Sequence, residues 1–400
     1  MKGNPGVTTF RHDGRDQIYA FVRGDNGRLY VCFWDATPNI TSWRWDDRGQ
    51  PVGARVNSSP TIITSIQNDS APEHFLHIFV RGNNGHLYEH FWDGFQWVGW
   101  VDHDQPHWTI SLAMSPGVAA FRGRYYYEED AFLADSADRL FVFAWGSSTS
   151  ASNDSLLWQY LHRDRLWRFQ GSLPNPQEYI VSEPAVIKHV FQNTIPYIYA
   201  YVVGHDGHLY VNHSADWAAS TWHWRDLGQP NANTTATWLM KPGLVSFTHD
   251  GEYRIYAFVG GSNGHLWNHF WQGWRQQGQG NWGDLGAPTG TTVASESGVV
   301  TFRHEGTDRI YVFVRGSDNH LHVCFWDGLQ WHWANLGRPT TGGDDVMAQP
   351  QGGNAPVSSA PGVITFTDRI YAFVSGGDNH LHVCYWNGVD SWLWTDLGTP

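Results

Sequence analysis

The chain has 400 residues, a formal net charge of −13 at pH 7 and 16% aromatic residues, with 24 tryptophans. This acidic balance argues against a nucleic-acid partner, because phosphate backbones are bound through tracks of Lys and Arg. No apolar run approaches the roughly 20 residues of a membrane-spanning helix, so we expect no membrane partner.

One pattern of short β-type segments recurs along the chain and is clearest in residues 298–339. Its four runs carry apolar residues at every second position, as a half-buried strand does; they are Val299–Phe302, Ile310–Val314, Leu321–Trp326 and Trp331–Leu336. Residues 316–319, small and polar, suit a tight hairpin, and Pro339 ends the fourth run because proline cannot donate to a β-ladder. Each copy therefore predicts a four-stranded antiparallel sheet.

Seven copies of this unit follow one another along the chain. They span approximately 5–51, 58–106, 115–174, 182–230, 241–288, 296–339 and 360–400, and the third copy is the most divergent. A lone four-stranded sheet cannot bury both faces, so the repeat predicts an all-β, seven-bladed β-propeller whose blades pack on one another. We expect a single domain over residues 1–400, with two β-sandwiches as the alternative.

The cysteines and the repeated histidines are interpreted as structural. Cys32, Cys324 and Cys384 occupy one repeat position in three copies, too far apart for a disulfide, and should be small buried apolar residues. Five copies place a histidine before the leucine of the third run: His86, His208, His265, His320 and His380. This regularity indicates a role in the turn and not in metal binding.

Six Asn-x-Ser/Thr sequons are present: Asn39, Asn57, Asn68, Asn153, Asn212 and Asn233. Such sequons accept N-glycans on the surface of secreted proteins, and most of these fall in connections between the runs. We therefore expect a secreted glycoprotein carrying N-glycans, with polar turn composition as the alternative. Residues 1–3 lead directly into the first run without a signal peptide, so the numbering is expected to be that of a mature domain.

Departures from the repeat are the better candidates for function. Met114, Met240 and Met347 lie in connections between copies, and Trp108 and Trp238 share two of these connections. Apolar side chains outside the strands predict the mouth of a pocket for small apolar or aromatic substrates. Packing of long loops on the blade edges is the alternative.

The third copy also carries an insertion at residues 122–138. Its Tyr126, between two other tyrosines, joins the pocket candidates, and the carboxylates that follow are Glu128, Glu129, Asp130 and Asp135. Carboxylate oxygens on a loop suit Ca²⁺, so we expect a calcium site here, with a solvated acidic loop as the alternative. No dinucleotide fingerprint, phosphate loop or hydrolase motif is present, and we expect no organic cofactor.

The repeated unit resembles those of fucose-binding propeller lectins from bacteria and fungi. The resemblance is carried by Ile-Tyr-x-Phe-Val, a Gly/Asn turn, His-Leu, Phe-Trp-Asp/Asn-Gly, Trp-x-Trp and Leu-Gly-x-Pro, over nearly all of the chain. It implies the propeller fold and multivalent carbohydrate binding between the blades. It is less specific for sugar binding, because the aromatic positions that match also pack the blades.

The sequons, the divergent copies and the apolar loops together resemble a second family, the secreted fungal hetero-Diels–Alderases of tropolone–sesquiterpenoid biosynthesis. That resemblance implies a calcium-dependent, N-glycosylated enzyme that joins a tropolone quinone methide to a humulene-type alkene by [4+2] cycloaddition. Orientation alone lowers such a barrier by roughly 7–11 kcal/mol, so no catalytic triad is required. We favour this enzyme over a non-catalytic lectin, and we assign neither catalytic residues nor an oligomeric state.

Overall fold

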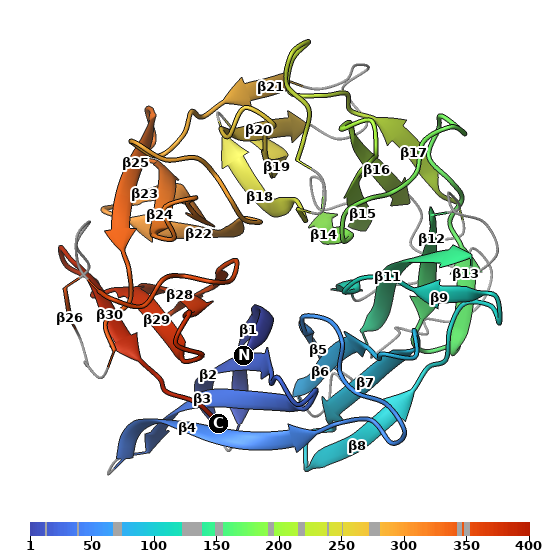
Figure 1. Ribbon diagram of the computed structural model, residues 1–400, viewed down its shortest axis with the longest axis horizontal. Coiled ribbons are helices and arrows are strands. Elements are labelled where there is room, and N and C mark those ends of the chain that lie inside the picture. Colours follow the sequence, from blue (N-terminus) through green and yellow to red (C-terminus); the bar gives the residue numbers. More distant parts are fainter. Residues whose placement is uncertain are drawn as a thin grey trace. The chain divides into compact units, whose positions relative to one another are not determined.

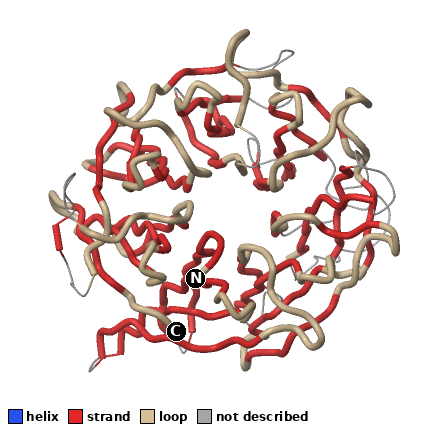
Figure 2. Tube along the Cα trace, viewed as in Figure 1, coloured by secondary structure: helices blue, strands red, loops and turns tan. Residues whose placement is uncertain are grey.

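The computed structural model describes residues 1–12, 14–37, 40–66, 74–121, 138–148, 155–190, 196–214, 221–237, 240–249, 251–271, 281–341, 346–347 and 353–400. The elements of regular secondary structure within these ranges are all β-strands. None of the described residues forms a helix long and apolar enough to cross a membrane. The strands form seven sheets, each built around four antiparallel strands that pair in chain order (Figure 1, Figure 2). The chain is therefore an all-β, seven-bladed β-propeller, as its repeats predict.

The blades follow the predicted copies in order. Blade 1 comprises β1 (Lys2–His12), β2 (Arg15–Arg23), β3 (Leu29–Thr37) and β4 (Ile40–Gly49); blade 2 comprises β5 (Thr61–Ile66), β6 (His74–Arg81), β7 (Leu87–Trp92) and β8 (Trp97–Asp102). Blade 3 comprises β10 (Gly117–Phe121), β11 (Arg139–Ser148), β12 (Ser155–Leu161) and β13 (Leu166–Phe169), with β9 (Ile110–Leu112) added beside β11. Blade 4 comprises β14 (Ala185–Val190), β15 (Pro196–Val203), β16 (Leu209–Ser214) and β17 (His223–Asp226).

The last three blades repeat the same order. Blade 5 comprises β18 (Gly243–His249), β19 (Glu252–Gly260), β20 (Leu266–Trp271) and β21 (Asn281–Asp284); blade 6 comprises β22 (Gly298–His304), β23 (Thr307–Arg315), β24 (Leu321–Trp326) and β25 (Trp331–Gly337). Blade 7 comprises β27 (Gly362–Phe366), β28 (Arg369–Ser375), β29 (Leu381–Trp386) and β30 (Trp392–Asp396), with β26 (Val346–Met347) added beside β30.

The blades group into two compact units, which are described separately. Residues 1–49 and 228–400 form the terminal unit, with blades 1, 5, 6 and 7, and residues 50–227 form the middle unit, with blades 2, 3 and 4. That all seven blades act as one domain stays a prediction.

Strand β23 shows why the alternating pattern produces stacked blades. Ile310, Val312 and Val314 point to one side, where they join a buried cluster with blade 5, whereas Tyr311 and Phe313 join a cluster with blade 7. Side chains of a strand alternate between its faces, so one apolar strand serves two interfaces. Burying each of these side chains contributes about 1.5–3 kcal/mol.

The three cysteines are free and buried, as predicted. Cys324 belongs to the cluster between blades 5 and 6, where burial raises the pKa of its thiol. These thiols therefore act as small apolar residues.

A tryptophan of the fourth strand links each of five blades to the blade before it. The indole N–H donates to a backbone carbonyl across the interface: Trp45 to Leu397 (2.7 Å), Trp333 to Leu285 (2.7 Å), Trp394 to Leu336 (2.8 Å), Trp167 to His103 (3.0 Å) and Trp224 to Gln170 (2.8 Å). Each bond gives a buried polar group a partner while the ring fills the interface. We call these bonds the indole latches.

Within the terminal unit, the first blade packs directly on the last (Figure 1). Strand β1 contacts β27 and β28, the Trp45 latch reaches Leu397, and the amide N–H of Ala360 donates to Asn4 Oδ1 at 3.0 Å. Each of the two sheets uses strands of its own blade alone. Face packing and hydrogen bonds therefore join blades 7 and 1 without a shared strand.

The regularly spaced histidines are structural, as predicted. Each side chain pairs through Nδ1 with a carboxylate or amide at the end of the fourth strand: His86 with Asp102, His208 with Asp226, His265 with Asp284, His320 with Asn335 and His380 with Asp396, at 2.9–3.2 Å. They tie the central hairpin of a blade to its outer strand.

Candidate functional site

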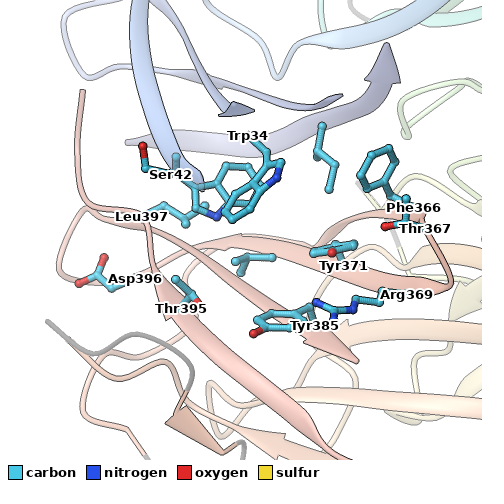
Figure 3. Close-up of a pocket in the computed structure, with 13 residues that line it drawn as sticks. Trp34, Ser42, Phe366, Thr367, Arg369, Tyr371, Tyr385, Thr395, Asp396 and Leu397 are labelled. Carbon is cyan, nitrogen blue, oxygen red and sulfur yellow. The ribbon is translucent and has the colours of Figure 1, made fainter. Parts of the chain in front are cut away.

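The terminal unit contains a cavity of about 690 Å³ between blades 7 and 1 (Figure 3). Trp34 and Trp43 line it from blade 1, and Arg369, Tyr371 and Tyr385 line it from blade 7. Phe366, Thr367, Thr395 and Asp396 complete much of the blade 7 side. The positions come from strands β3, β4 and β27–β30, so a rigid sheet fixes most of them.

The walls of this cavity combine aromatic faces with one guanidinium group. Figure 3 shows Trp34 on one side and Tyr385 with Arg369 on the other. Trp34 packs edge-on against Trp43 with ring centroids 5.4 Å apart, and Tyr371 stacks on Tyr385 at 5.6 Å. The Arg369 guanidinium lies over the Tyr385 ring, 5.9 Å from its centroid, an attractive cation–π arrangement.

The polar groups of the cavity are mainly hydrogen-bond donors. Burial raises the pKa of Tyr371, which Arg369 only partly offsets, so its phenol stays protonated. The guanidinium of Arg369 adds a rigid set of N–H donors. Asp396 is already engaged, because it pairs with His380 Nδ1 at 2.9 Å and accepts the amide N–H of Gly398 at 2.9 Å.

A smaller cavity of about 330 Å³ lies at the equivalent interface between blades 5 and 6. Here Arg254 lies over Phe270, 5.2 Å from the ring centroid, and Trp326 packs on Trp331 with centroids 5.7 Å apart. The arrangement repeats that of Arg369, Tyr385, Trp34 and Trp43. The two cavities are therefore the same feature of the repeat, and their difference in size needs a local cause.

That cause is the length of the first hairpin of each blade. In blades 5 and 6 the hairpin ends in a histidine: His249 packs on Trp326 of blade 6 at 5.3 Å, and His304 packs on Trp386 of blade 7 at 5.6 Å. In blade 7 the chain turns directly after the pair Phe366–Arg369, whereas the hairpins of blades 5 and 6 add two further pairs at this point. The described hairpin of blade 7 thus has no imidazole to place against Trp34, and the space stays open.

The short turn carries backbone strain at the rim of the cavity. Thr367 and Asp368 both have positive φ, 42° and 58°, which a two-residue hairpin of this type requires. A β-branched residue in this region is unfavourable, at a cost of order 1–3 kcal/mol. The equivalent turn of blade 6 uses Glu305–Gly306, where glycine takes the second position without strain.

Four of the predicted pocket residues belong to the described part of the chain, and none of these four lines either cavity. Trp108 is 81% exposed and packs on its neighbour His107, and Met114 is half-buried in the connection before β10. Met240 lies against Gly260, and Met347 is 56% exposed on the added strand β26. Trp238 and Tyr126 lie outside the described residues. The structure assigns the cavities instead to tryptophans, tyrosines and arginines that the sequence pattern attributes to blade packing.

The expected calcium ligands Glu128, Glu129, Asp130 and Asp135 lie outside the described residues. The end of their insertion is described: the Asp138 carboxylate accepts the amide N–H of Ile66 at 2.8 Å, which fixes it to blade 2. The calcium site therefore stays a prediction.

The sequons divide into three groups. Asn39, Asn68 and Asn153 lie outside the described residues, and Asn57 and Asn233 are exposed. Asn212 is fully buried in β16, where its Nδ2 donates to the carbonyl of Gln170 at 3.1 Å. The expectation of a glycan on Asn212 is wrong for the folded chain, because that amide nitrogen is already bonded inside an interface.

No protein-family model matches the sequence, and no curated protein matches it. Among solved structures, the chain is similar to the BP39L lectin from Burkholderia pseudomallei at 14% identity and a TM-score of 0.62, covering 100% of this chain and 99% of that one. It is also similar to a triple arginine-to-alanine mutant of AofleA from Arthrobotrys oligospora, at 14% identity and a TM-score of 0.50, covering 84% and 87%. A third similar structure is a single asparagine-to-glutamine mutant of the Aleuria aurantia lectin in complex with alpha-methyl-L-fucoside, at 12% identity, a TM-score of 0.49 and coverages of 99% and 96%. At these identities the similarity to the first two structures shows the fold, a lectin-like propeller.

Proposed function

We propose that the chain is a carbohydrate-binding propeller whose principal site is the cavity between blades 7 and 1. The observation that carries this proposal is the open space beside Trp34, which His249 and His304 narrow at the equivalent interfaces 5–6 and 6–7. The repeat's resemblance to sugar-binding propellers and the lectin-like fold support it.

The walls suit the two kinds of surface that a sugar presents. The apolar C–H face of a pyranose packs on an aromatic ring, which Trp34 and Tyr385 offer from opposite blades. Its hydroxyl oxygens accept hydrogen bonds from the guanidinium of Arg369 and from the protonated phenol of Tyr371. A few placed donors in an otherwise aromatic hollow is the usual composition of a small-molecule site.

A glycan array followed by calorimetry with methyl α-L-fucoside or the best array ligand tests the proposal. We expect Arg369→Ala to weaken binding about 10- to 100-fold, because it removes charged donors worth roughly 1.5–3 kcal/mol. Arg254→Ala, which removes the same group from the smaller cavity, is the matched control and should leave the affinity unchanged.

A hairpin exchange gives the same test without touching a proposed contact. Replacing Thr367–Asp368 with the six residues 303–308 of blade 6 gives blade 7 the longer hairpin, and its histidine should fill the space beside Trp34. Binding should then fall by at least 10-fold while the sheet is retained in circular dichroism. A flat array, or equal affinities for all these variants, would contradict the proposal.

The cycloaddition is the second candidate, favoured by the size and lining of the same cavity. About 690 Å³ lies within the range of small-molecule pockets, and Trp34, Phe366 and Tyr371 offer apolar faces that would hold two apolar reactants together. A donor such as Arg369 would stabilise the charge that develops on a quinone methide oxygen.

Incubation with a tropolone quinone-methide precursor and humulene tests this candidate by chiral chromatography. We expect enantiopure adduct above the spontaneous background from the wild-type chain and a lower yield from Arg369→Ala. An EDTA-treated sample that regains yield with Ca²⁺ would support the proposed calcium site. Racemic adduct at the background rate would contradict the proposal that the chain catalyses this cycloaddition, and it would leave the carbohydrate proposal in place.

A further inference from the structure

The middle unit contains a cluster of four ionisable side chains at the interface between blades 2 and 3. These side chains are His77 on β6, Glu89 on β7, His103 after β8 and His162 after β12. They occupy the repeat positions that line the cavity of the terminal unit, where the corresponding residues are Tyr371, Val383, Leu397 and Trp34. The interface between blades 2 and 3 thus has three imidazoles and a carboxylate where the interface between blades 7 and 1 has aromatic and aliphatic side chains.

The three histidine side chains converge on the carboxylate of Glu89. His77 Nδ1 lies 2.6 Å from Oε1, and His103 Nε2 and His162 Nε2 lie 2.8 and 3.0 Å from Oε2. The ligand atoms of His77, Glu89 and His162 all lie within 4.8 Å of one another, and His103 stands outside this group with its Nε2 2.8 Å from Glu89 Oε2. Donors around a tetrahedral ion with bonds of about 2.0–2.2 Å are roughly 3.3 Å apart, so an ion would draw the first three side chains closer together and His103 in toward them.

The cluster is buried but has one accessible member. The side chains of His77 and Glu89 are 1% exposed, that of His103 is 5% exposed, and that of His162 is 25% exposed. The site therefore holds its carboxylate and two of its imidazoles away from water and leaves one imidazole partly at the surface.

The far nitrogens of two of the rings are also held in place. His77 Nε2 lies 2.9 Å from Ser65 Oγ, and His103 Nδ1 lies 2.9 Å from Tyr160 Oη. In the tautomer that carries its proton on the far nitrogen, each ring donates to the hydroxyl oxygen and leaves the nitrogen that faces Glu89 able to bind an ion. Such partners orient the histidine ligands of known metal sites.

We propose that His77, Glu89, His103 and His162 bind one divalent transition-metal ion of the zinc class. Three imidazole nitrogens and one carboxylate oxygen match the ligands and the coordination number of Zn²⁺. The set does not suit Ca²⁺, which takes six to eight oxygen ligands. His162 is the ligand through which the ion enters, because it alone of the four reaches solvent substantially. Phe91 packs beside the His77 ring and Phe79 beside the His162 ring.

Two further groups with metal-ligand side chains serve as controls. Asp318, His320 and His322 lie within one hairpin, and Asp378, His380 and His382 form its counterpart in blade 7. Their carboxylates accept backbone amides of the turn, and His320 and His380 pair with Asn335 and Asp396 on the outer strand. These contacts build the blade, so we assign no ion to them.

Titration of the full chain with Co²⁺, after treatment with EDTA and dialysis, tests the proposal. We expect one equivalent to bind with the intense visible absorption of a four-coordinate site, and one equivalent of Zn²⁺ to abolish that absorption. Zn²⁺ should also raise the thermal unfolding midpoint, because an ion that binds the native chain stabilises it.

The variants identify the ligands. Glu89→Gln and His162→Gln should each weaken Co²⁺ binding by at least 10-fold, whereas His320→Gln should leave it unchanged. If Glu89→Gln fails to fold, Co²⁺ binding by the His162→Gln variant tests the proposal, because the His162 side chain is partly exposed and its replacement disturbs the fold less. Absence of a stoichiometric Co²⁺ spectrum in the wild-type chain, or an unchanged spectrum in a folded His162→Gln variant, would overturn the proposal.

Discussion

At the scale of single residues, the exceptions to the repeat carry the chemistry. In blade 4, His213 takes the position that Phe33 and Phe325 hold in blades 1 and 6. Its imidazole is 6% exposed, stacks on Tyr199 with ring centroids 5.7 Å apart and lies 5.8 Å from His223. Burial, with smaller contributions from Arg225 and His223, lowers the pKa of His213 to about 4.

This depressed pKa predicts a loss of stability in mild acid. The unfolded chain protonates this imidazole near pH 6.5, whereas the folded chain resists until about pH 4, so between these values the unfolded state binds more protons. The free energy of unfolding should therefore fall as the pH drops from 6.5 to 4, by up to about 3 kcal/mol from this residue.

Urea unfolding at several pH values checks the prediction, with His213→Phe as the comparison. The phenylalanine restores the residue of other blades and cannot be protonated, so its midpoint should change less between pH 6.5 and 4. Parallel pH profiles for the two chains would show that His213 is not responsible.

The candidate sites were predictable from the sequence only in part, for reasons visible at single residues. Trp34 and Trp326 obey the same pattern, and both pack between blades as that pattern predicts; Trp34 faces the larger cavity, whereas His249 packs on Trp326 and narrows the smaller one. Asn212 satisfies the sequon, but side chains alternate between the two faces of β16, and that of Asn212 points into an interface between blades. In both cases the deciding contact comes from the neighbouring blade, which the local sequence does not contain.

At the scale of elements, the strands were predictable and the hairpin lengths were informative. Copy six reads Phe302 to Arg309 with six residues between, and copy seven reads Phe366 to Arg369 with two, while the flanking residues match. A shorter connection inside an otherwise faithful copy signals an opened interface. The methionines in the connections are unusual for this repeat, but an unusual residue type in a loop does not by itself create a concave surface.

The interface between blades 2 and 3 illustrates a second rule for elements. His77 alternates with Leu76 and Ile78 in β6 as Tyr371 alternates with Ile370 and Ala372 in β28. The strand pattern is preserved while the chemistry of one position changes. Aligning the copies position by position would therefore have exposed the histidine cluster, because each of its members replaces an apolar or aromatic residue of the repeat.

At the scale of the whole molecule, the fold was predictable because every copy agrees with it. Stability of such repeats is approximately a sum of blade terms and neighbour-interface terms. The indole latches belong to the interface terms: Trp394 of blade 7 is 1% exposed and donates to the carbonyl of Leu336 in blade 6 at 2.8 Å. The Leu336 side chain is itself buried in the cluster between these blades.

Trp394→Phe should therefore weaken the chain through an interface and not through its own strand. Phenylalanine keeps an aromatic ring but leaves the Leu336 carbonyl without its donor, which costs about 1–3 kcal/mol, and its smaller volume adds to the loss. Trp108→Phe is the matched control, because Trp108 is 81% exposed and surface substitutions change stability by about 0.5 kcal/mol or less. Urea unfolding followed by far-ultraviolet circular dichroism should give a lower midpoint for Trp394→Phe alone. Equal midpoints for the two variants would mean that face packing holds the blades together without the latch.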